Sequence, residues 1–275
     1  MSERPAVVSL AMYALPETEW APGALWRRIA TDMRRQGLRE VALPKDVDGV
    51  HDMAALIPNR TIVFGQTCGF PFTHSLAGRL QLLGTPIYDA PGCRGPLYRS
   101  LVVVRAESSL RTLGDLRGHV VAVNSWDSQS GWNALAALVA PLALRGNFFS
   151  SARISGSHVQ SLAAVRAGHA DVAAIDCVTF ALLHKHRRAA VTGLRVIAET
   201  EAAPALPFVT DADTQPEVVS ALKRALLGAL ADPALAEARS ELLLNWIEDL
   251  PPAAYDVIPE MASRAIPPPP LRPGG

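Results

Sequence analysis

The stretch that decides the fold is residues 119–139, HVVAVNSWDSQSGWNALAALV. Residues 119–123 are a short apolar run rich in valine, which predicts a buried strand. Trp132, Leu135 and Val139 then recur at helical spacing and predict a helix with one apolar face. A strand, a polar turn and an amphipathic helix form the building unit of an α/β protein.

The same alternation extends outward along the chain. We expect further strands at residues 7–12, 41–43, 61–64, 101–104, 172–175 and 195–198. We expect helices around Leu25, Trp26, Ile29 and Met33 up to Gly37, around Leu76, Leu80 and Leu83, over residues 159–167 up to Gly168, and over most of the chain from Pro216 onward. This pattern predicts sheets that are mostly parallel, because helices connect the strands.

Two such cycles with a helical closing section predict two α/β lobes, the second inserted into the first. The first lobe comprises residues 1–101 and 205–265, and the second comprises residues 102–204. Residues 266–275 form a tail with five prolines, which favours extended conformations and argues against packed structure.

Composition excludes several classes of protein. Of the 275 residues 49% are hydrophobic and 19% charged, which supplies a large core and argues against disorder. Lys plus Arg equals Asp plus Glu at 26 each, so a general electrostatic attraction to nucleic acid is not supported. The cysteines, Cys68, Cys93 and Cys177, show no C-x-x-C spacing, so neither a disulfide scaffold nor a zinc module is indicated.

The chain contains no run of about 18 apolar residues, so we expect no membrane insertion. Its first residues lack a basic region followed by a long apolar stretch, the pattern of a secretory signal. As written, the chain is expected in the cytoplasm, or in the periplasm if the true start lies upstream.

The turn before residues 132–139 carries the small residues Ser128, Ser130 and Gly131. A helix start presents unpaired backbone N–H groups and partial positive charge, and serine hydroxyls add donors. This combination predicts an anion-binding turn without any Lys or Arg. Simple N-capping of the helix by Ser128 or Ser130 is the structural alternative.

Two further segments have a similar character. Ser157 and Gln160 fit a capping box, and His158 at the first helical position could instead donate to a bound oxygen. Asp176 ends an apolar strand, where ligands of open α/β sheets bind, but it could equally cap a helix. Cys177, next in sequence, is expected to be a buried thiol.

In order along the chain, these segments resemble a known family. They are YRSLVVVR at 98–105, LGDLRGHVVA at 113–122, DSQSG at 127–131, GSH at 156–158 and AVRAGHADVAAID at 164–176. This order is similar to the phosphate/phosphite/phosphonate substrate-binding proteins of ABC transporters, a branch of the type 2 periplasmic binding proteins. The resemblance is closest over residues 95–180.

The resemblance implies two lobes joined by hinge strands near residues 100–105 and 200–210, which close on a small oxyanion in the cleft between them. The ligand-binding residues that it implies are Ser128, Ser130, Gly131, Ser157, His158 and Asp176, with Tyr13, Thr67, Cys68, Tyr98 and Ser100 as further contacts. One departure from the family is Val159, since an acidic residue commonly follows the histidine in phosphonate binders.

We therefore expect a monomeric solute-binding protein that takes a phosphate, phosphite or phosphonate-like ligand for uptake through an ABC permease. We expect no catalytic residues, metal or cofactor, because the sequence lacks nucleophile-elbow, phosphate-loop, dinucleotide and zinc motifs. The alternative is a cytoplasmic enzyme or sensor on the same scaffold, with Cys68, His158 and Asp176 in one cleft.

Overall fold

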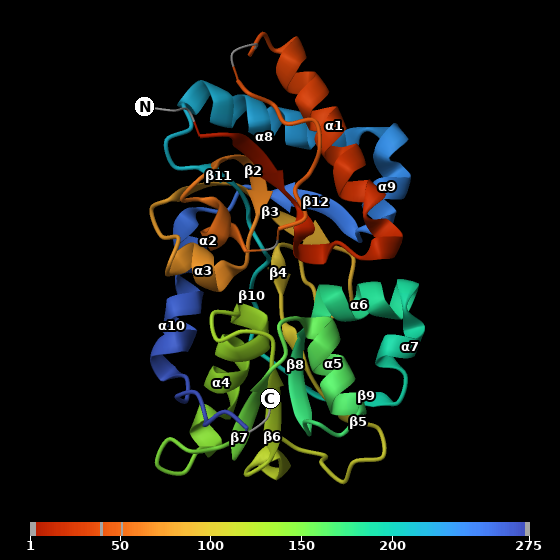
Figure 1. Ribbon diagram of the computed structural model, residues 1–275, viewed down its shortest axis with the longest axis vertical. Coiled ribbons are helices and arrows are strands. Elements are labelled where there is room, and N and C mark those ends of the chain that lie inside the picture. Colours follow the sequence, from red (N-terminus) through yellow and green to blue (C-terminus); the bar gives the residue numbers. More distant parts are fainter. Residues whose placement is uncertain (1–3, 39–40, 51, 273–275) are drawn as a thin grey trace. The chain divides into compact units, whose positions relative to one another are not determined.

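The computed structural model describes residues 4–38, 41–50 and 52–272. The chain folds into two compact units, each with its own sheet and helices (Figure 1). The first unit comprises Met1–Asp89 and Pro204–Ala254, and the second comprises Ala90–Ala203 and Tyr255–Gly275.

These boundaries differ from the expected ones at two places. Residues 90–101 belong to the second unit because β5 (Ser100–Arg105) pairs on both sides with strands of that unit. Residues 255–265 also belong to it, because α10 (Val257–Arg264) packs on α4 (Ala134–Val139).

The sheet of the first unit has the order β1-β2-β11-β3-β12. Its strands are β1 (Ala6–Ser9), β2 (Thr61–Gln66), β11 (Phe208–Asp211), β3 (Leu80–Tyr88) and β12 (Leu244–Glu248). Only β1 and β2 run parallel, and β11 and β12 are antiparallel to their neighbours. The helices of this unit are α1 (Trp20–Arg35), α2 (Met53–Leu56), α3 (Gly69–Thr73), α8 (Pro216–Ala231) and α9 (Ala236–Glu241).

Helix α1 forms where the sequence predicts it, because its apolar residues lie on one face. Trp26, Ile29 and Met33 are fully buried, and α1 packs on α8. The helix ends at Arg35, and Gly37 follows with a φ of +82°, a conformation that favours glycine at a helix end. The ring of Trp26 stacks on Phe64 of β2 at 6.1 Å, which attaches the helix to the sheet.

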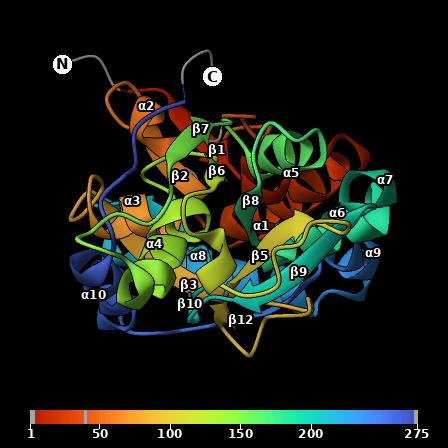
Figure 2. The same cartoon turned by 90° about the horizontal axis from the view of Figure 1, so that it is seen from below.

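The sheet of the second unit has the order β7-β6-β8-β5-β9. Its other strands are β6 (Val120–Val123), β7 (Ser151–Ile154), β8 (Val172–Asp176) and β9 (Leu194–Glu199), and its other helices are α5 (His158–Arg166), α6 (Cys177–His186) and α7 (Arg188–Val191). β7, β6 and β8 run parallel to one another. β5 lies between β8 and β9 and is antiparallel to both. Figures 1 and 2 both show β5 running beside β9. β4 (Leu97–Tyr98) and β10 (Ala203–Pro204) form a separate two-stranded ladder.

The predicted α/β class is confirmed, but the pairing is mixed where mostly parallel sheets were expected. β5 and β11 follow the points at which the chain passes from one unit to the other, and both return antiparallel to the strands beside them. Helical connections had suggested parallel neighbours, but these two strands do not follow such helices.

Two predicted elements are wrong. Residues 41–43 belong to the described chain and lie outside any strand. Leu80 and Leu83 belong to strand β3, since the chain turns at Gly78, whose φ is +72°. Their spacing mimics a helix because both side chains are buried in a strand with several buried positions. The chain after Pro216 is mostly helical, as predicted, and it also contributes strand β12.

The proline-rich tail packs, contrary to expectation, over its described residues 266–272. Ile266 is buried in the core of the second unit, and its N–H donates to Ala136 at 3.3 Å. Further along, Ala152 of β7 donates to Pro270 and accepts from Arg272, both at 2.8 Å. Prolines fit here because an extended segment at a sheet edge needs few N–H donors.

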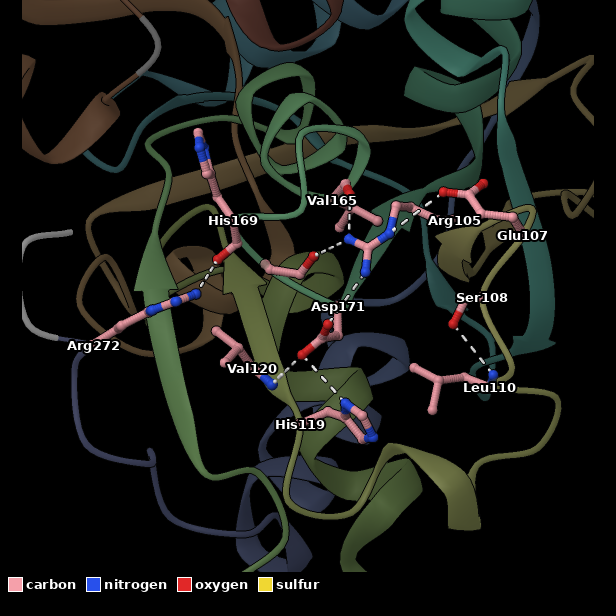
Figure 3. A network of polar contacts seen from close by, with 11 residues as sticks. Arg105, Glu107, Ser108, Leu110, His119, Val120, Val165, His169, Asp171 and Arg272 are labelled. Atoms are coloured by element: carbon pink, nitrogen blue, oxygen red, sulfur yellow. Dashed lines mark hydrogen bonds and ion pairs between the residues drawn. The ribbon is translucent and has the colours of Figure 1, made fainter.

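A polar network stabilises the amino-terminal end of the β6–β8 pair (Figure 3). Arg105 donates to the carbonyl of Val165 in the last turn of α5 at 2.9 Å, and to that of Ala170 beyond the helix at 3.1 Å. Asp171 accepts from the N–H of Val120 at 3.0 Å and lies 3.3 Å from Nδ1 of His119. These contacts fix the ends of the strands opposite to the predicted ligand turns.

In the described part of the chain, no helix has the length and apolar character needed to cross a membrane.

Candidate functional site

The candidate site lies at the carboxyl edge of the second unit's sheet. β6, β7 and β8 run parallel, so the segments that follow them emerge at one edge. The segment after β6 begins at Asn124, that after β7 at Ser155, and β8 ends at Asp176. Backbone bonds join the first two, since Gly156 N–H donates to the Asn124 carbonyl at 3.1 Å. The predicted turns are therefore neighbours.

Ser128 begins the helical segment after β6. Its hydroxyl oxygen accepts from the N–H of Gly131 at 2.9 Å, so the capping role that the sequence allowed is present. The first helical turn, Gln129–Asn133, is of the wide π type, and α4 continues it. A hydroxyl has one proton and two acceptor sites, so a capping serine keeps its O–H for a ligand. Capping and ligand binding are thus compatible at Ser128.

Ser130 connects this helix start to the next one. Its hydroxyl lies 2.9 Å from Nε2 of His158, the first residue of α5. Its backbone carbonyl accepts from the hydroxyl of Ser100 at 2.8 Å. The structure therefore brings together Ser100, Ser130 and His158, from three separate segments of the sequence.

His158 is held in its neutral form. Burial lowers the pKa of its imidazole from 6.5 to about 4, and the nearby carbonyl of Ala174 opposes this shift only in part. The side chain keeps some exposure, but Nδ1 is buried and has no partner of normal hydrogen-bond geometry among the described residues. At neutral pH a neutral ring can give or take one proton toward Ser130, depending on its tautomer.

Ser157 and Asp176 act as helix caps. The hydroxyl of Ser157 accepts from the N–H of Gln160 at 3.2 Å. The Oδ1 atom of Asp176 accepts from Val178 at 2.7 Å and Thr179 at 3.0 Å, at the start of α6. Asp176 is also paired across the ladder with Ser100 of β5. The carboxylate is thus engaged by backbone donors at the same edge as Ser130.

Gly131 provides room for a side chain that was not among the predicted site residues. A Cβ atom at position 131 would lie 1.6 Å from Oδ1 of Asn124. That amide oxygen is buried and has no hydrogen-bond partner within the described chain. Asn124 follows directly after β6, so its position at a strand end was the available signal. Glycine at position 131 is therefore needed for the approach of this amide.

The remaining predicted residues lie elsewhere. Tyr13 ends a short helical turn after β1, and its ring meets Tyr88 edge-on at 5.1 Å. Thr67 and Cys68 follow β2, which is parallel to β1, so all three lie beyond the carboxyl ends of these strands in the first unit. Tyr98 of the second unit is buried in β4.

The carboxyl edge of the second unit's sheet offers a ligand uncharged hydrogen-bond donors. Residues 124–131 contain no Lys or Arg, and the donors are hydroxyls and backbone amides. The Ser130–His158 contact has the distance of a nucleophile and its base. However, Nδ1 of His158 has no carboxylate partner among the described residues to orient the ring for catalysis. Such an arrangement suits the binding of an oxyanion.

Residues 51–254, well over half of the chain, match the family model described as "ABC transporter, phosphonate, periplasmic substrate-binding protein". No curated protein sequence matches the chain.

Several solved structures share the fold. PhnD1 from Prochlorococcus marinus (MIT 9301), solved with methylphosphonate, is 14% identical with a TM-score of 0.75, and the match covers 95% of this chain and 98% of that one. The binding-protein component of an ABC phosphonate transporter from Pseudomonas aeruginosa is 15% identical with a TM-score of 0.71, covering 94% and 86%. XAC2383 from Xanthomonas citri, solved with ATP, is 18% identical with a TM-score of 0.67, covering 96% and 97%. The predicted type 2 periplasmic binding protein fold is confirmed.

Proposed function

Since the chain belongs to the periplasmic substrate-binding proteins of ABC phosphonate transporters, we propose that it captures a small tetrahedral oxyanion. The ligand is a phosphonate, phosphate or phosphite, which the protein delivers to an ABC permease. The observation that carries this proposal is the 2.9 Å contact between Ser130 and His158 at the shared edge of two helix starts.

In the bound state, the hydroxyls of Ser128 and Ser130 donate to the oxyanion. Ser128 keeps its proton for this purpose while its oxygen caps the helix. In the tautomer that carries its proton on Nε2, His158 donates to the Ser130 oxygen, and the Ser130 proton is then available to the ligand. Hydrogen bonds to a charged group are stronger than those between neutral groups, so neutral donors are sufficient here.

Asp176 gives the site its selectivity among oxyanions. A second negative charge beside the ligand disfavours a fully ionised oxyanion and favours one that carries a proton or an ammonium group. Gly131, Ser157 and Tyr98 are further proposed ligand contacts in the second unit, and Tyr13, Thr67 and Cys68 of the first unit stay predictions from the family resemblance.

Calorimetric titration of the purified protein with methylphosphonate, phosphate and phosphite tests the proposal. Sulfate is the matched control, because it is tetrahedral but carries no proton at neutral pH. We expect saturable binding of at least one of the three phosphorus oxyanions and much weaker binding of sulfate. Absence of binding to all three, or equal binding of sulfate, would reject the assignment.

The protein binds its ligand without turning it over. Incubation with each phosphorus oxyanion, followed by phosphorus NMR, should therefore leave the ligand spectrum unchanged apart from binding effects. A new phosphorus signal that disappears in His158→Ala would instead establish the enzymatic alternative.

A further inference from the structure

Two cysteines that are far apart in the sequence lie close together in the second unit. The sulfur atoms of Cys93 and Cys177 are 3.6 Å apart. Cys93 lies in the turn before β4, where its N–H donates to Ala90 at 2.9 Å. Cys177 is the first residue of α6, and its N–H donates to Arg99 at 3.0 Å. Both are thiols in the structure.

The backbone of the turn is built to approach Cys177. Gly92 has a φ of +99°, which favours glycine, and a Cβ atom there would lie only 2.9 Å from Cβ of Cys177. Any other residue at position 92 would push the turn away from α6. The backbone path therefore brings the turn close to Cys177, and the rotamers of the two cysteines set the sulfur–sulfur distance of 3.6 Å.

We propose that Cys93 and Cys177 form an oxidative modification site. There, an oxidant that is itself a disulfide converts the two thiols to an intramolecular disulfide. The sulfurs are 3.6 Å apart and a disulfide bond is about 2.05 Å long, so roughly 1.5 Å of closure is needed. Small side-chain rotations supply a movement of this size. The proposal does not depend on the oxyanion-binding function.

The two thiols have different parts in the reaction. Cys93 is partly exposed and attacks the oxidant as a thiolate, forming a mixed disulfide and releasing one thiol. Cys177 is 1% exposed, and the contact with Cys93, burial and the Asp176 carboxylate raise the pKa of its thiol. The Cys177 sulfur then attacks the Cys93 sulfur and breaks the mixed disulfide, and the departing thiolate takes up the Cys177 proton and leaves as a second thiol. In sum, two protein thiols are oxidised and one oxidant disulfide is reduced to two thiols.

The bond would connect two segments that matter for the candidate site. Cys93 lies shortly after residue 90, where the chain enters the second unit. Cys177 directly follows Asp176, whose carboxylate caps α6. The disulfide therefore links the entry segment of the second unit to the strand end that carries Asp176.

The test uses the full chain, reduced and then treated with oxidised glutathione at neutral pH. After alkylation of remaining thiols, intact mass and peptide mapping are measured for the wild type, Cys93→Ser, Cys177→Ser and the matched control Cys68→Ser. We expect the oxidised wild type to take up one alkyl group and Cys68→Ser none, whereas their reduced forms take up three and two, and both should yield a peptide joined through Cys93 and Cys177. Neither other variant should form that link.

Three outcomes would overturn the proposal. These are retention of all three thiols, a link that involves Cys68, and a glutathione adduct on Cys93 that does not resolve to the internal disulfide. Because Cys177 is buried, Cys177→Ser could fail to fold. In that case the peptide maps of the wild type and of Cys93→Ser decide whether the link forms, since position 93 is partly exposed and its substitution leaves the core unchanged.

Discussion

Ser130 lies 2.9 Å from Nε2 of His158, and this contact joins two helix starts that are 28 residues apart in the sequence. It exists because β6 and β7 run parallel and the segments after them emerge at the same edge. A serine next to a neutral imidazole is a polarised hydrogen-bond donor. The proposed oxyanion site depends on this pair.

Removal of either serine hydroxyl should weaken ligand binding. Each hydroxyl donates one bond to a charged ligand, so Ser128→Ala and Ser130→Ala should each cost about 1.5–3 kcal/mol of binding free energy. Calorimetric titration with methylphosphonate measures this cost. Ser263→Ala, an exposed serine of α10, is the control and should bind as the wild type does. Unchanged affinity in Ser128→Ala/Ser130→Ala would refute the assignment of donors.

His158 should make the protein less stable in acid. The pKa of its imidazole is about 4 in the folded protein and 6.5 when it is unperturbed, so between these pH values the unfolded chain binds more protons. The contribution of His158 to stability is complete above about pH 6.5 and declines as the pH falls toward 4. His158→Gln lacks this titration, and thermal unfolding across that pH range should show a shallower decline. Parallel profiles for the two proteins would contradict the shift.

Gly131 should tolerate a methyl group only if Asn124 is shortened. The added Cβ would overlap Oδ1 of Asn124, so Gly131→Ala should lower the free energy of unfolding by about 1–3 kcal/mol. In Gly131→Ala/Asn124→Ala the overlapping atoms are absent, and most of this loss should be recovered relative to Asn124→Ala alone. Urea unfolding of the four proteins measures the coupling. Simple additivity of the two changes would show that the contact is unimportant.

Arg105 should affect stability without affecting the ligand. Its guanidinium holds the carbonyls of Val165 and Ala170 at the opposite end of the sheet from the site. Arg105→Met keeps the apolar stem but loses these bonds, and should cost about 1.5–3 kcal/mol of unfolding free energy. Its affinity for methylphosphonate should equal that of the wild type, as should that of the control Arg111→Met, an exposed arginine. A selective loss of affinity in Arg105→Met would contradict this separation of roles.

Much of the second unit is predictable because its local signals agree. The valine run before Asn124, the apolar stripe of Trp132 and Leu135, and Gly168 after α5 each indicate an element and its end. Parallel pairing then places the segments after β6 and β7 together. The edge that carries Ser130, His158 and Asp176 could therefore be foreseen from the order of the elements.

The parts that could not be foreseen depend on contacts distant in sequence. Strand β3 is defined by its pairing with β11 and β12, which lie far along the chain, so its leucines gave a misleading helical spacing. The packing of Ile266 requires a groove that only the folded unit provides. The same holds for Cys93 and Cys177, whose proximity arises from a glycine turn and not from any sequence motif.

A crystal structure of the protein grown with methylphosphonate tests the central claim most directly. The account predicts phosphonate oxygens within hydrogen-bond distance of the hydroxyls of Ser128 and Ser130, with Nε2 of His158 still bonded to Ser130. A phosphonate bound elsewhere, without contact to residues 128–131, would contradict it.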